Sequence, residues 1–293
     1  MTDNPGVIVA AITPRGTRGG ADLGAAFDLL DYWCAAGVGG IALFGATGEY
    51  PALTFDERTR LLSLAAKRTR VPLFAGVGSA SLDASLALAH EALAAGVVGI
   101  LLPPPHFFRY EQDDIREFYL EFAAEMGDGA AMFLSSAPSG ASGMAVETAL
   151  GLLETGRFAG IEDASGSQES FACLMAAASE GSFRVMVGDD ALFTSARRAG
   201  ASAISPVACA VPELMVALDR AITAGNQQEA GRLDRMLQEF IGWMRQFPQP
   251  AVVKVATGLR GLKTGPLAVP LPPGKQRKLD EFREWFQGWL PSV

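Results

Sequence analysis

Residues 40–68, GIALFGATGEYPALTFDERTRLLSLAAKR, contain the unit on which the fold depends. The first six residues are apolar or glycine, as expected of a short strand that is covered on both faces. The segment 53–68 has the apolar spacing of a helix, and Thr54 stands three residues before Glu57, which predicts a capping box at the helix start. A strand followed by a helix is the building block of parallel sheets.

The same unit recurs along the chain. Eight strand-and-helix pairs predict an α/β fold, a TIM (β/α)8 barrel over 1–225 with a C-terminal helical appendage over 226–293 packed on it. In such a barrel the functional groups gather at the carboxyl ends of the strands. The expected strands are 6–13, 40–45, 72–77, 99–104, 130–136, 158–163, 183–188 and 201–206.

A doubly wound open sheet is the alternative to a barrel. That fold would carry a glycine-rich phosphate turn, G-x-G-x-x-G, after an early strand. The turn after the second expected strand is FGATGE (44–49), which does not fit that pattern. The sequence therefore favours the barrel.

The composition is that of a globular chain. Of the 293 residues, 49% are hydrophobic and 19% are charged, which provides for a sizeable core. The net charge of −8 leaves no basic surface to neutralise phosphates, so neither nucleic acid nor anionic membrane is expected as a partner. No apolar run approaches the roughly 18 residues that span a bilayer, and no basic stretch precedes the first apolar segment. We therefore expect a cytoplasmic protein.

Three cysteines, Cys34, Cys173 and Cys209, lie far apart in the sequence and in apolar neighbourhoods. Their odd number and wide spacing favour reduced thiols over a disulfide framework or a metal site.

The stretch LFGATGEYPALTFDER (43–58) resembles the dihydrodipicolinate synthase and N-acetylneuraminate lyase family, in which a G-T-T-G-E turn precedes T/S-x-x-E-R. Similar motifs are AAITP (10–14), VGDD (187–190), GASAISPVACAVPEL (200–214) and VKVATGLRGLKTGPLAVPL (253–271). The resemblance implies the same barrel and aldol addition or cleavage on pyruvate through a Schiff base on a sixth-strand lysine. It also implies a homo-oligomer, either a dimer or a tetramer.

The residues that carry this chemistry in the family are replaced here. GIEDASG (160–166) stands where the family reads G-I-K-[DE]-[AS]-[ST]-G, so Glu162 occupies the lysine position. The fifth-strand motif Y-N-x-P becomes SSAP, with Ser135 in place of the tyrosine. After the fourth strand P-Y-Y becomes PHFF, which puts Phe107 at a second tyrosine, and Ala46 replaces the first threonine of the turn.

None of the five lysines offers a substitute. A Schiff base requires a neutral amine at a strand end that faces the pocket. Lys67 falls at the end of a helix, and the other four, Lys254, Lys263, Lys275 and Lys278, fall in the appendage. We therefore predict that Schiff-base activity is absent.

If the barrel follows the family register, Glu162 points inward beside Ser135. An isolated buried carboxylate is costly to ionise, so its pKa should rise toward the range of a general acid or base. We assign Glu162 and Ser135 to catalysis. The expected substrate-binding residues around them are Ala46, Thr47, Gly48, Glu49, His106, Phe107, Ser136 and Ser205.

Three features of this region have two interpretations. His106 could titrate in the pocket or be an ordinary loop histidine. Glu162 could join Glu49 and other acids in a Mg²⁺ site, but Glu162 and Asp163 alternate on one strand and cannot both face it, so no metal and no cofactor is expected. The loop SAPSGASG (136–143), where the family often carries an arginine for the substrate carboxylate, has none and is either a lid or a plain loop.

Two functions remain open from the sequence. The first is a lyase-type enzyme on a small keto acid or related carbonyl or carboxylate compound, with Glu162 as the acid or base in place of an imine. The second is a catalytically inactive pseudoenzyme in which Glu162 is a polar plug and the pocket serves as a small-molecule binding or regulatory module.

Overall fold

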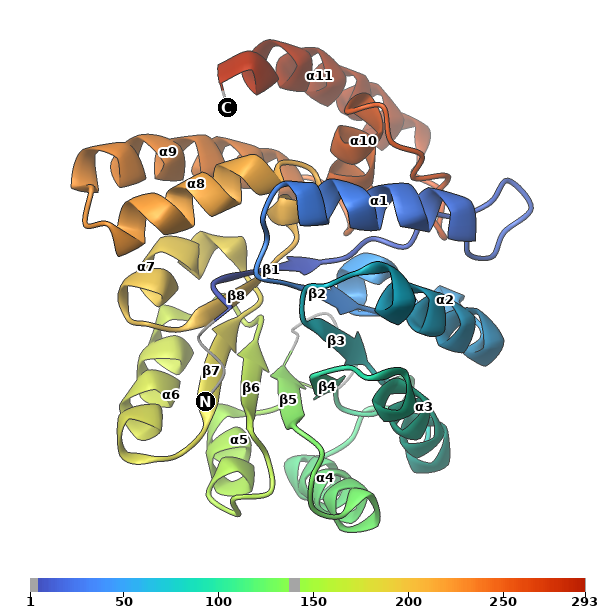
Figure 1. Ribbon diagram of the computed structural model, residues 1–293, viewed down its shortest axis with the longest axis vertical. Helices are drawn as coiled ribbons and strands as arrows, with labels where there is room; N and C mark the ends of the chain where they lie inside the picture. Colours follow the sequence, from blue (N-terminus) through green and yellow to red (C-terminus); the bar gives the residue numbers. More distant parts are fainter. Residues whose placement is uncertain (1–4, 137–142, 293) are drawn as a thin grey trace.

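A closed barrel of eight parallel strands forms the centre of the molecule, and the strands pair in chain order with β1 beside β8 (Figure 1). The computed structural model describes residues 5–136 and 143–292. This architecture confirms the predicted barrel. The strands are β1 Val7–Ala10, β2 Gly40–Leu43, β3 Leu73–Gly76, β4 Gly99–Leu102, β5 Met132–Ser136, β6 Gly160–Asp163, β7 Arg184–Val187 and β8 Ser202–Ser205.

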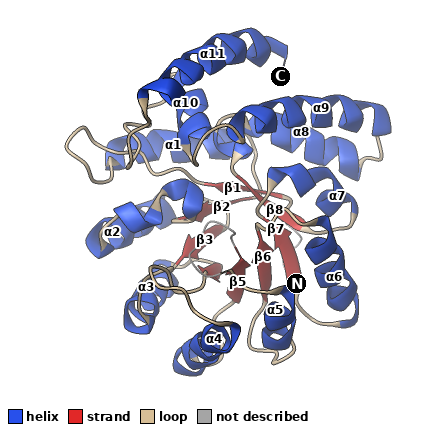
Figure 2. Cartoon of the chain, turned by 180° about the vertical axis from the view of Figure 1, so that it is seen from behind, coloured by secondary structure: helices blue, strands red, loops and turns tan. Residues whose placement is uncertain are grey.

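A ring of helices surrounds the barrel, and three further helices lie to one side of it (Figures 1 and 2). The ring consists of α1 Leu23–Ala35, α2 Phe55–Arg68, α3 Leu82–Ala95, α4 Gln112–Met126, α5 Val146–Leu153, α6 Gln168–Glu180, α7 Phe193–Arg198 and α8 Pro212–Thr223. The additional helices are α9 Gln227–Met244, α10 Ala251–Leu259 and α11 Pro273–Trp289.

The strand-and-helix unit at residues 40–68 forms as its sequence predicts. The helix α2 begins after Thr54, whose hydroxyl accepts a hydrogen bond from the backbone N–H of Glu57 at 3.2 Å. The carboxylate of Glu57 accepts one in return from the backbone N–H of Thr54 at 2.8 Å. Each bond satisfies a donor that the start of a helix leaves free.

The strands are shorter than the apolar runs that predicted them. The run at 6–13 continues past the end of β1, and Ala11 and Ile12 are buried although they lie in the following loop. Apolar residues here mark buried positions, whether or not these positions belong to a strand. The predicted strand boundaries therefore extend beyond the observed strands.

Side chains alternate between the interior of the barrel and the surrounding helices. The interior cluster consists of Ile8, Ala10, Ala42, Phe74, Leu101, Phe133, Met186 and Ile204. A second, larger cluster fills the space between barrel and helices, and it continues into α9 and α11 through residues such as Phe240 and Phe286. The same apolar cluster includes residues on both sides of the predicted boundary at 225/226, and this boundary stays a prediction.

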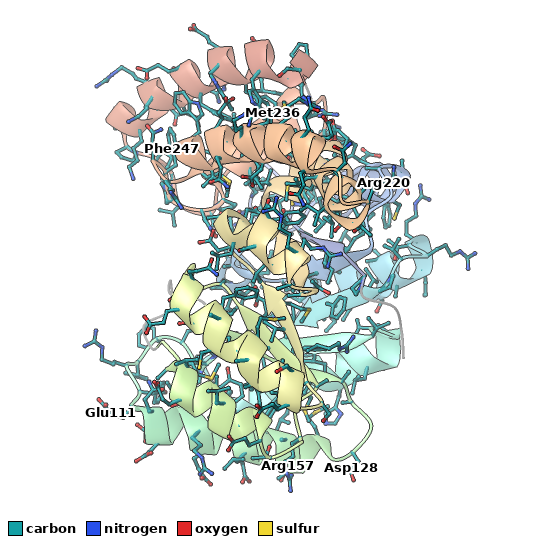
Figure 3. All side chains as sticks on the ribbon, turned by 90° about the vertical axis from the view of Figure 1, so that its left-hand side faces the viewer. Glu111, Asp128, Arg157, Arg220, Met236 and Phe247 are labelled. Atoms are coloured by element: carbon teal, nitrogen blue, oxygen red, sulfur yellow. The ribbon has the colours of Figure 1, made fainter. Side chains whose placement is uncertain are left out.

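The chain after α9 reaches the carboxyl ends of the strands. Figure 3 shows Phe247, which follows α9, on the same side of the molecule as Glu111 from the loop after β4, away from Asp128 and Arg220. The C-terminal helices therefore contribute to the face where a TIM barrel carries its functional groups. Within residues 5–136 and 143–292, no helix is both long and apolar enough to cross a membrane.

Candidate functional site

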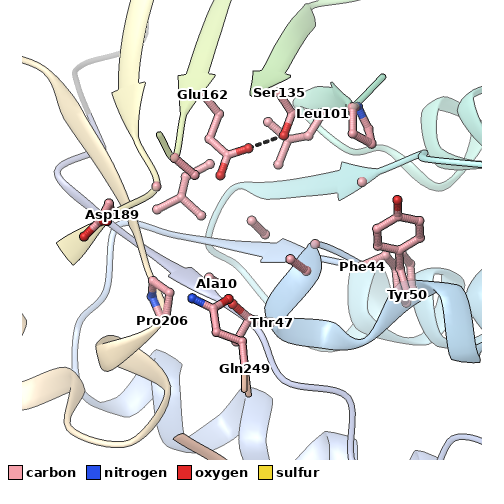
Figure 4. A pocket seen from close by; sticks show the side chains of 18 of the residues that line it. Ala10, Phe44, Thr47, Tyr50, Leu101, Ser135, Glu162, Asp189, Pro206 and Gln249 are labelled. Atoms are coloured by element: carbon pink, nitrogen blue, oxygen red, sulfur yellow. Dashed lines mark hydrogen bonds between the residues drawn. The ribbon is translucent and has the colours of Figure 1, made fainter. Parts of the chain in front are cut away.

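A cavity of about 880 Å³ opens at the carboxyl ends of the strands (Figure 4). Its walls are largely apolar, with residues such as Ala10, Ala42, Leu101 and Ile204 contributed by four strands. The end of α9 and the segment after it cover one side through Ile241, Met244, Arg245, Phe247, Pro248 and Gln249. A concave, mostly apolar site with a few polar groups is typical of small-molecule binding.

Glu162 and Ser135 lie side by side in this cavity. The pairing of β5 with β6 sets the two residues opposite each other, and the Ser135 hydroxyl donates a hydrogen bond to Oε2 of Glu162 (Figure 4). Burial raises the pKa of the Glu162 carboxyl; the Ser135 hydrogen bond opposes this rise and the charge of Asp163 adds to it. The site therefore favours a protonated, neutral carboxyl more than water does.

Asp163 faces the opposite way, as the alternation of a strand requires. Its carboxylate accepts hydrogen bonds of 3.0 Å from both the backbone N–H and the hydroxyl of Ser165. Asp163 is buried and does not line the cavity. Across the described part of the chain, no group of three or more His, Cys, Asp or Glu side chains is arranged to hold a metal ion.

Tyr50 and His106 form a second polar pair in the cavity. The Tyr50 hydroxyl lies 3.3 Å from Nδ1 of His106, and the two rings meet edge to face. Burial raises the pKa of Tyr50. The pKa of His106 is lowered, first by burial and then by the positive charge of Arg58. His106 thus reaches the cavity as one of the two sequence interpretations requires.

Arg58 supports this pair from behind the cavity wall. Its guanidinium donates to the backbone carbonyls of Gly76 at 2.6 Å and Gly78 at 2.9 Å, and it lies over the rings of Phe44 and Tyr50 at 5.4 and 5.5 Å. Burial lowers the pKa of Arg58 to about 10. The charge therefore acts on the cavity through the aromatic rings and not by direct contact with a ligand.

Asp190 is a buried carboxyl at the edge of the cavity. Burial raises its pKa to about 7, although the hydroxyl of Ser205 and the backbone N–H of Val207, at 2.9 Å, donate hydrogen bonds to it. Ser205 itself is fully buried and does not line the cavity. Its hydroxyl holds Asp190 in place, so the structure gives Ser205 no direct access to a ligand.

The structure brings half of the predicted site residues to the cavity. Those that line it are Ala46, Thr47, His106, Ser135 and Glu162. Those that do not are Gly48, Glu49, Phe107, Ser136 and Ser205. The roles assigned to all ten stay predictions, but a ligand in the cavity would meet only the first group.

Glu49 and Phe107 show why the second group lies elsewhere. Glu49 forms an ion pair with Lys254 of α10 and accepts a hydrogen bond of 2.7 Å from the backbone N–H of Ala268. Phe107 has a backbone φ of 99° and a side chain that is 78% exposed, so its ring projects into solvent beside Phe108. Residues 137–142 of the predicted loop SAPSGASG lie outside the described residues.

None of the five lysines, all of which the structure describes, lines the cavity. Lys254 is the one buried lysine among them, and its ammonium group donates to Glu49 and, at 3.2 Å, to the backbone carbonyl of Pro266. Its pKa is lowered mainly by burial. These hydrogen bonds hold the amine at Glu49 and Pro266, outside the set of residues that line the cavity.

Several lining residues were not found from the sequence. Tyr50 directly follows the GATGE turn, and this position in the sequence could have predicted that it lies near the cavity. The segment Ile241–Gln249 carries no motif and is separated from Ser205, the last predicted site residue, by α8 and most of α9. Only tertiary packing could place it at the cavity.

Comparisons with known proteins agree with this architecture. The model of the dihydrodipicolinate synthetase family matches residues 3–287. A 4-hydroxy-tetrahydrodipicolinate synthase of Moorella thermoacetica is 32% identical over 268 residues, which cover 90% of this chain and 91% of the relative. The solved structure of the 4-hydroxy-tetrahydrodipicolinate synthase of Methylacidiphilum fumariolicum is 28% identical with a TM-score of 0.86, and the match covers 98% of this chain and 97% of that one.

A more distant structure has the same fold. The sialic acid aldolase of Ruminococcus gnavus superposes with a TM-score of 0.86 over 98% of both chains, at 22% identity. The family match spans nearly the whole sequence, and the Moorella relative aligns over nine tenths of it. On these grounds the chain belongs to the dihydrodipicolinate synthetase family.

Proposed function

We propose that this chain is a lyase-type enzyme that acts on a small keto acid or a related carbonyl or carboxylate compound without forming a Schiff base. Glu162 is the acid or base of the reaction, and the Ser135 hydroxyl orients its carboxyl. The single observation that supports this most is the Ser135–Glu162 hydrogen bond inside the cavity, on the strand position where the family carries its lysine.

The electrostatics of the cavity fit an acid at this place. A lyase reaction on a carbonyl compound develops negative charge on the carbonyl oxygen, and a protonated carboxyl can donate a proton or a hydrogen bond to that oxygen. Burial favours the protonated form of Glu162. An imine would achieve the same withdrawal of electrons, but it needs an amine that none of the lining residues supplies.

Borohydride trapping tests the absence of a Schiff base. The protein is incubated with pyruvate and sodium borohydride, and its intact mass is then measured. We expect no mass increase on the wild-type chain, because the only buried lysine of the five, Lys254, is bound to Glu49. A lysine adduct located by peptide mapping would disprove the imine-free mechanism.

Turnover of candidate keto acids tests the role of Glu162. We expect Glu162→Gln to abolish activity, because the amide can neither donate nor accept the proton, while its shape preserves the Ser135 contact. Full activity in this variant, at unchanged stability, would contradict the proposal.

A binding module is the second candidate function. It is favoured by one observation: the Ser135 hydroxyl and the Glu162 carboxyl are hydrogen-bonded to each other, as in a polar plug. Saturable binding of a small ligand with no turnover under any condition would support this candidate over the enzyme. Assembly as a dimer or tetramer stays a prediction for either candidate, and sedimentation velocity would test it.

A further inference from the structure

Tyr50 and His106 have no part in the reaction described so far. Tyr50 begins the short helix Tyr50–Ala52 after the GATGE turn, and His106 lies in the loop after β4. Both line the same cavity as Glu162. Figure 4 shows the Tyr50 ring and the Glu162 carboxyl on different sides of that cavity, so a ligand between them would meet one group at each end.

The contact between Tyr50 and His106 provides a path for a proton. Nδ1 of His106 faces the Tyr50 hydroxyl at 3.3 Å. In the neutral tautomer that carries its hydrogen on Nε2, Nδ1 accepts the hydrogen bond of the phenol. Tyr50 can then take up a proton from a ligand while it passes its own proton to His106.

Burial and nearby charge keep the imidazole of this pair neutral. Burial lowers the pKa of His106, and the guanidinium of Arg58, which lies 5.5 Å from the Tyr50 ring, lowers it further. His106 therefore rests as the neutral imidazole, whose unprotonated nitrogen can accept a proton. Glu162 differs in that burial favours its protonated form. The cavity thus holds a proton acceptor and a proton donor at separate positions, as acid–base catalysis of one substrate requires.

We infer that Tyr50 and His106 form a proton-accepting dyad that works with Glu162 to cleave β-hydroxy carbonyl compounds without an imine. The inference rests on the proposed function, because it gives Glu162 the part of the acid. Tyr50 and His106 are catalytic residues in this scheme. Arg58, whose guanidinium donates to the carbonyls of Gly76 and Gly78 and lies over the Tyr50 ring, does not line the cavity and is a positioning residue.

The reaction balances without a further reagent. The Tyr50 oxygen accepts the proton of the β-hydroxyl group as the phenol passes its proton to His106. The bond between the α and β carbons breaks, the β carbon leaves as an aldehyde, and the carbonyl oxygen takes the proton of Glu162 to give an enol. The enol oxygen then returns its proton to Glu162, and the α carbon receives the proton from the dyad, which restores all three side chains.

Cleavage of two defined probes tests the inference. The probes are 4-hydroxy-2-oxobutanoate and its uncharged analogue 4-hydroxy-2-butanone, and the release of formaldehyde is followed by proton NMR. Tyr50→Phe and His106→Gln are compared with Glu162→Gln. Tyr110→Phe is the matched control, because Tyr110 lies outside this cavity beside α4.

We expect Tyr50→Phe and His106→Gln each to lower kcat for at least one probe by about 100-fold while KM changes less than about threefold, because each loss removes proton transfer and not binding. The Tyr110→Phe variant should keep the wild-type kcat. Thermal unfolding of each variant verifies that the chain is folded. A double variant of Tyr50 and His106 should be no slower than either single one, because the two residues act as one unit.

The outcomes separate this inference from the proposed function. If Glu162→Gln is inactive but both dyad variants retain wild-type kcat, the dyad is disproved and the proposed function stands. If the dyad variants are inactive and Glu162→Gln is not, the dyad stands and the role of Glu162 fails. Absence of cleavage of both probes by the wild-type protein would overturn the inference, whatever the outcome with keto acids.

Discussion

The carboxyl of Glu162 lies where a side chain at position 188 would begin, and Gly188 has none. A Cβ atom at Gly188, just after β7, would lie 2.5 Å from Oε1 of Glu162 and 2.7 Å from Cβ of Ala164. Neither approach is sterically acceptable, and Ala164 cannot move without its backbone. The absence of a side chain at Gly188 is therefore a condition for the position of Glu162.

Gly188→Ala should consequently displace Glu162 and weaken its hydrogen bond to Ser135. We expect the free energy of unfolding to fall by about 1–3 kcal/mol, as for other overpacked interiors, and activity to fall with it. Urea denaturation measures the first effect. The control is Gly151→Ala in α5, where a Cβ meets nothing within 4 Å; this change should stabilise the chain by roughly 0.5–1 kcal/mol. Equal stability of the two variants would contradict the steric argument.

Ser135→Ala should raise the pKa of Glu162 further. The Ser135 hydroxyl lowers this pKa by donating to the carboxylate, and its loss leaves burial unopposed by that bond. If Glu162 acts as the acid, activity declines as pH rises through its pKa, so this decline should move to higher pH in the variant. A pH–rate profile checks the shift. Ser136→Ala, whose side chain does not line the cavity, is the matched control, and a profile that moves equally in both variants would refute the assignment.

Asp190→Asn should flatten the pH dependence of stability. The unfolded chain loses the Asp190 proton near 3.8, whereas the folded chain holds it up to about 7. Because the pKa of this acid is raised on folding, the wild-type stability falls as pH rises between these values, by a free energy on the order of 4 kcal/mol. Asparagine cannot ionise and keeps an oxygen for the Val207 N–H. Urea denaturation from pH 4 to 8 compares the slopes, and parallel slopes would disprove the burial cost.

Removing one charge of the Lys254–Glu49 ion pair should destabilise the fold more than removing both. Lys254 is 2% exposed and Glu49 is 11% exposed, so removal of either charge leaves the other buried without its partner. We expect Lys254→Met to lower the free energy of unfolding by about 3–5 kcal/mol.

The double variant Lys254→Met with Glu49→Gln completes this experiment. The uncharged pair removes the isolated charge, and the amide that replaces the Glu49 carboxylate retains an oxygen for the Ala268 N–H, so the double variant should be more stable than Lys254→Met alone. Urea denaturation of the wild type, both single variants and the double variant measures the interaction. A strictly additive loss in the double variant would show that the two side chains do not interact.

The parts of the site on neighbouring strands were predictable from the sequence. Successive residues of a strand face opposite ways, which separates Glu162 from Asp163, and parallel pairing sets Glu162 beside Ser135. Such local rules depend only on residues close together on one strand or on two adjacent strands. The resemblance to the family motifs located Glu162 and Ser135, and these rules explain why the two residues meet. The recurring strand-and-helix pairs predicted the barrel itself.

The sequence is least informative where distant contacts decide the geometry. Glu49 was expected at the ligand, but its partner Lys254 lies 205 residues further along the chain. No sequence motif predicts the ion pair between Glu49 and Lys254. Glu49 also has a left-handed backbone with φ of 55°, after which the chain turns and places Tyr50 in the cavity instead. Hydrophobic periodicity and residue propensities do not predict such a turn, so the position of Tyr50 in the cavity was missed.

The cavity takes its reactive groups and its cover from different parts of the chain. Glu162 and Ser135 belong to barrel strands whose register fixes them, whereas Ile241–Gln249 belongs to the end of α9 and its connection to α10. Substitutions in that connection alter the size and polarity of what fits without moving a single strand. Under the proposed function, substrate preference and reaction chemistry would therefore be separately adjustable, and exchanging this connection between related proteins would be a direct way to transfer the preference of one to another.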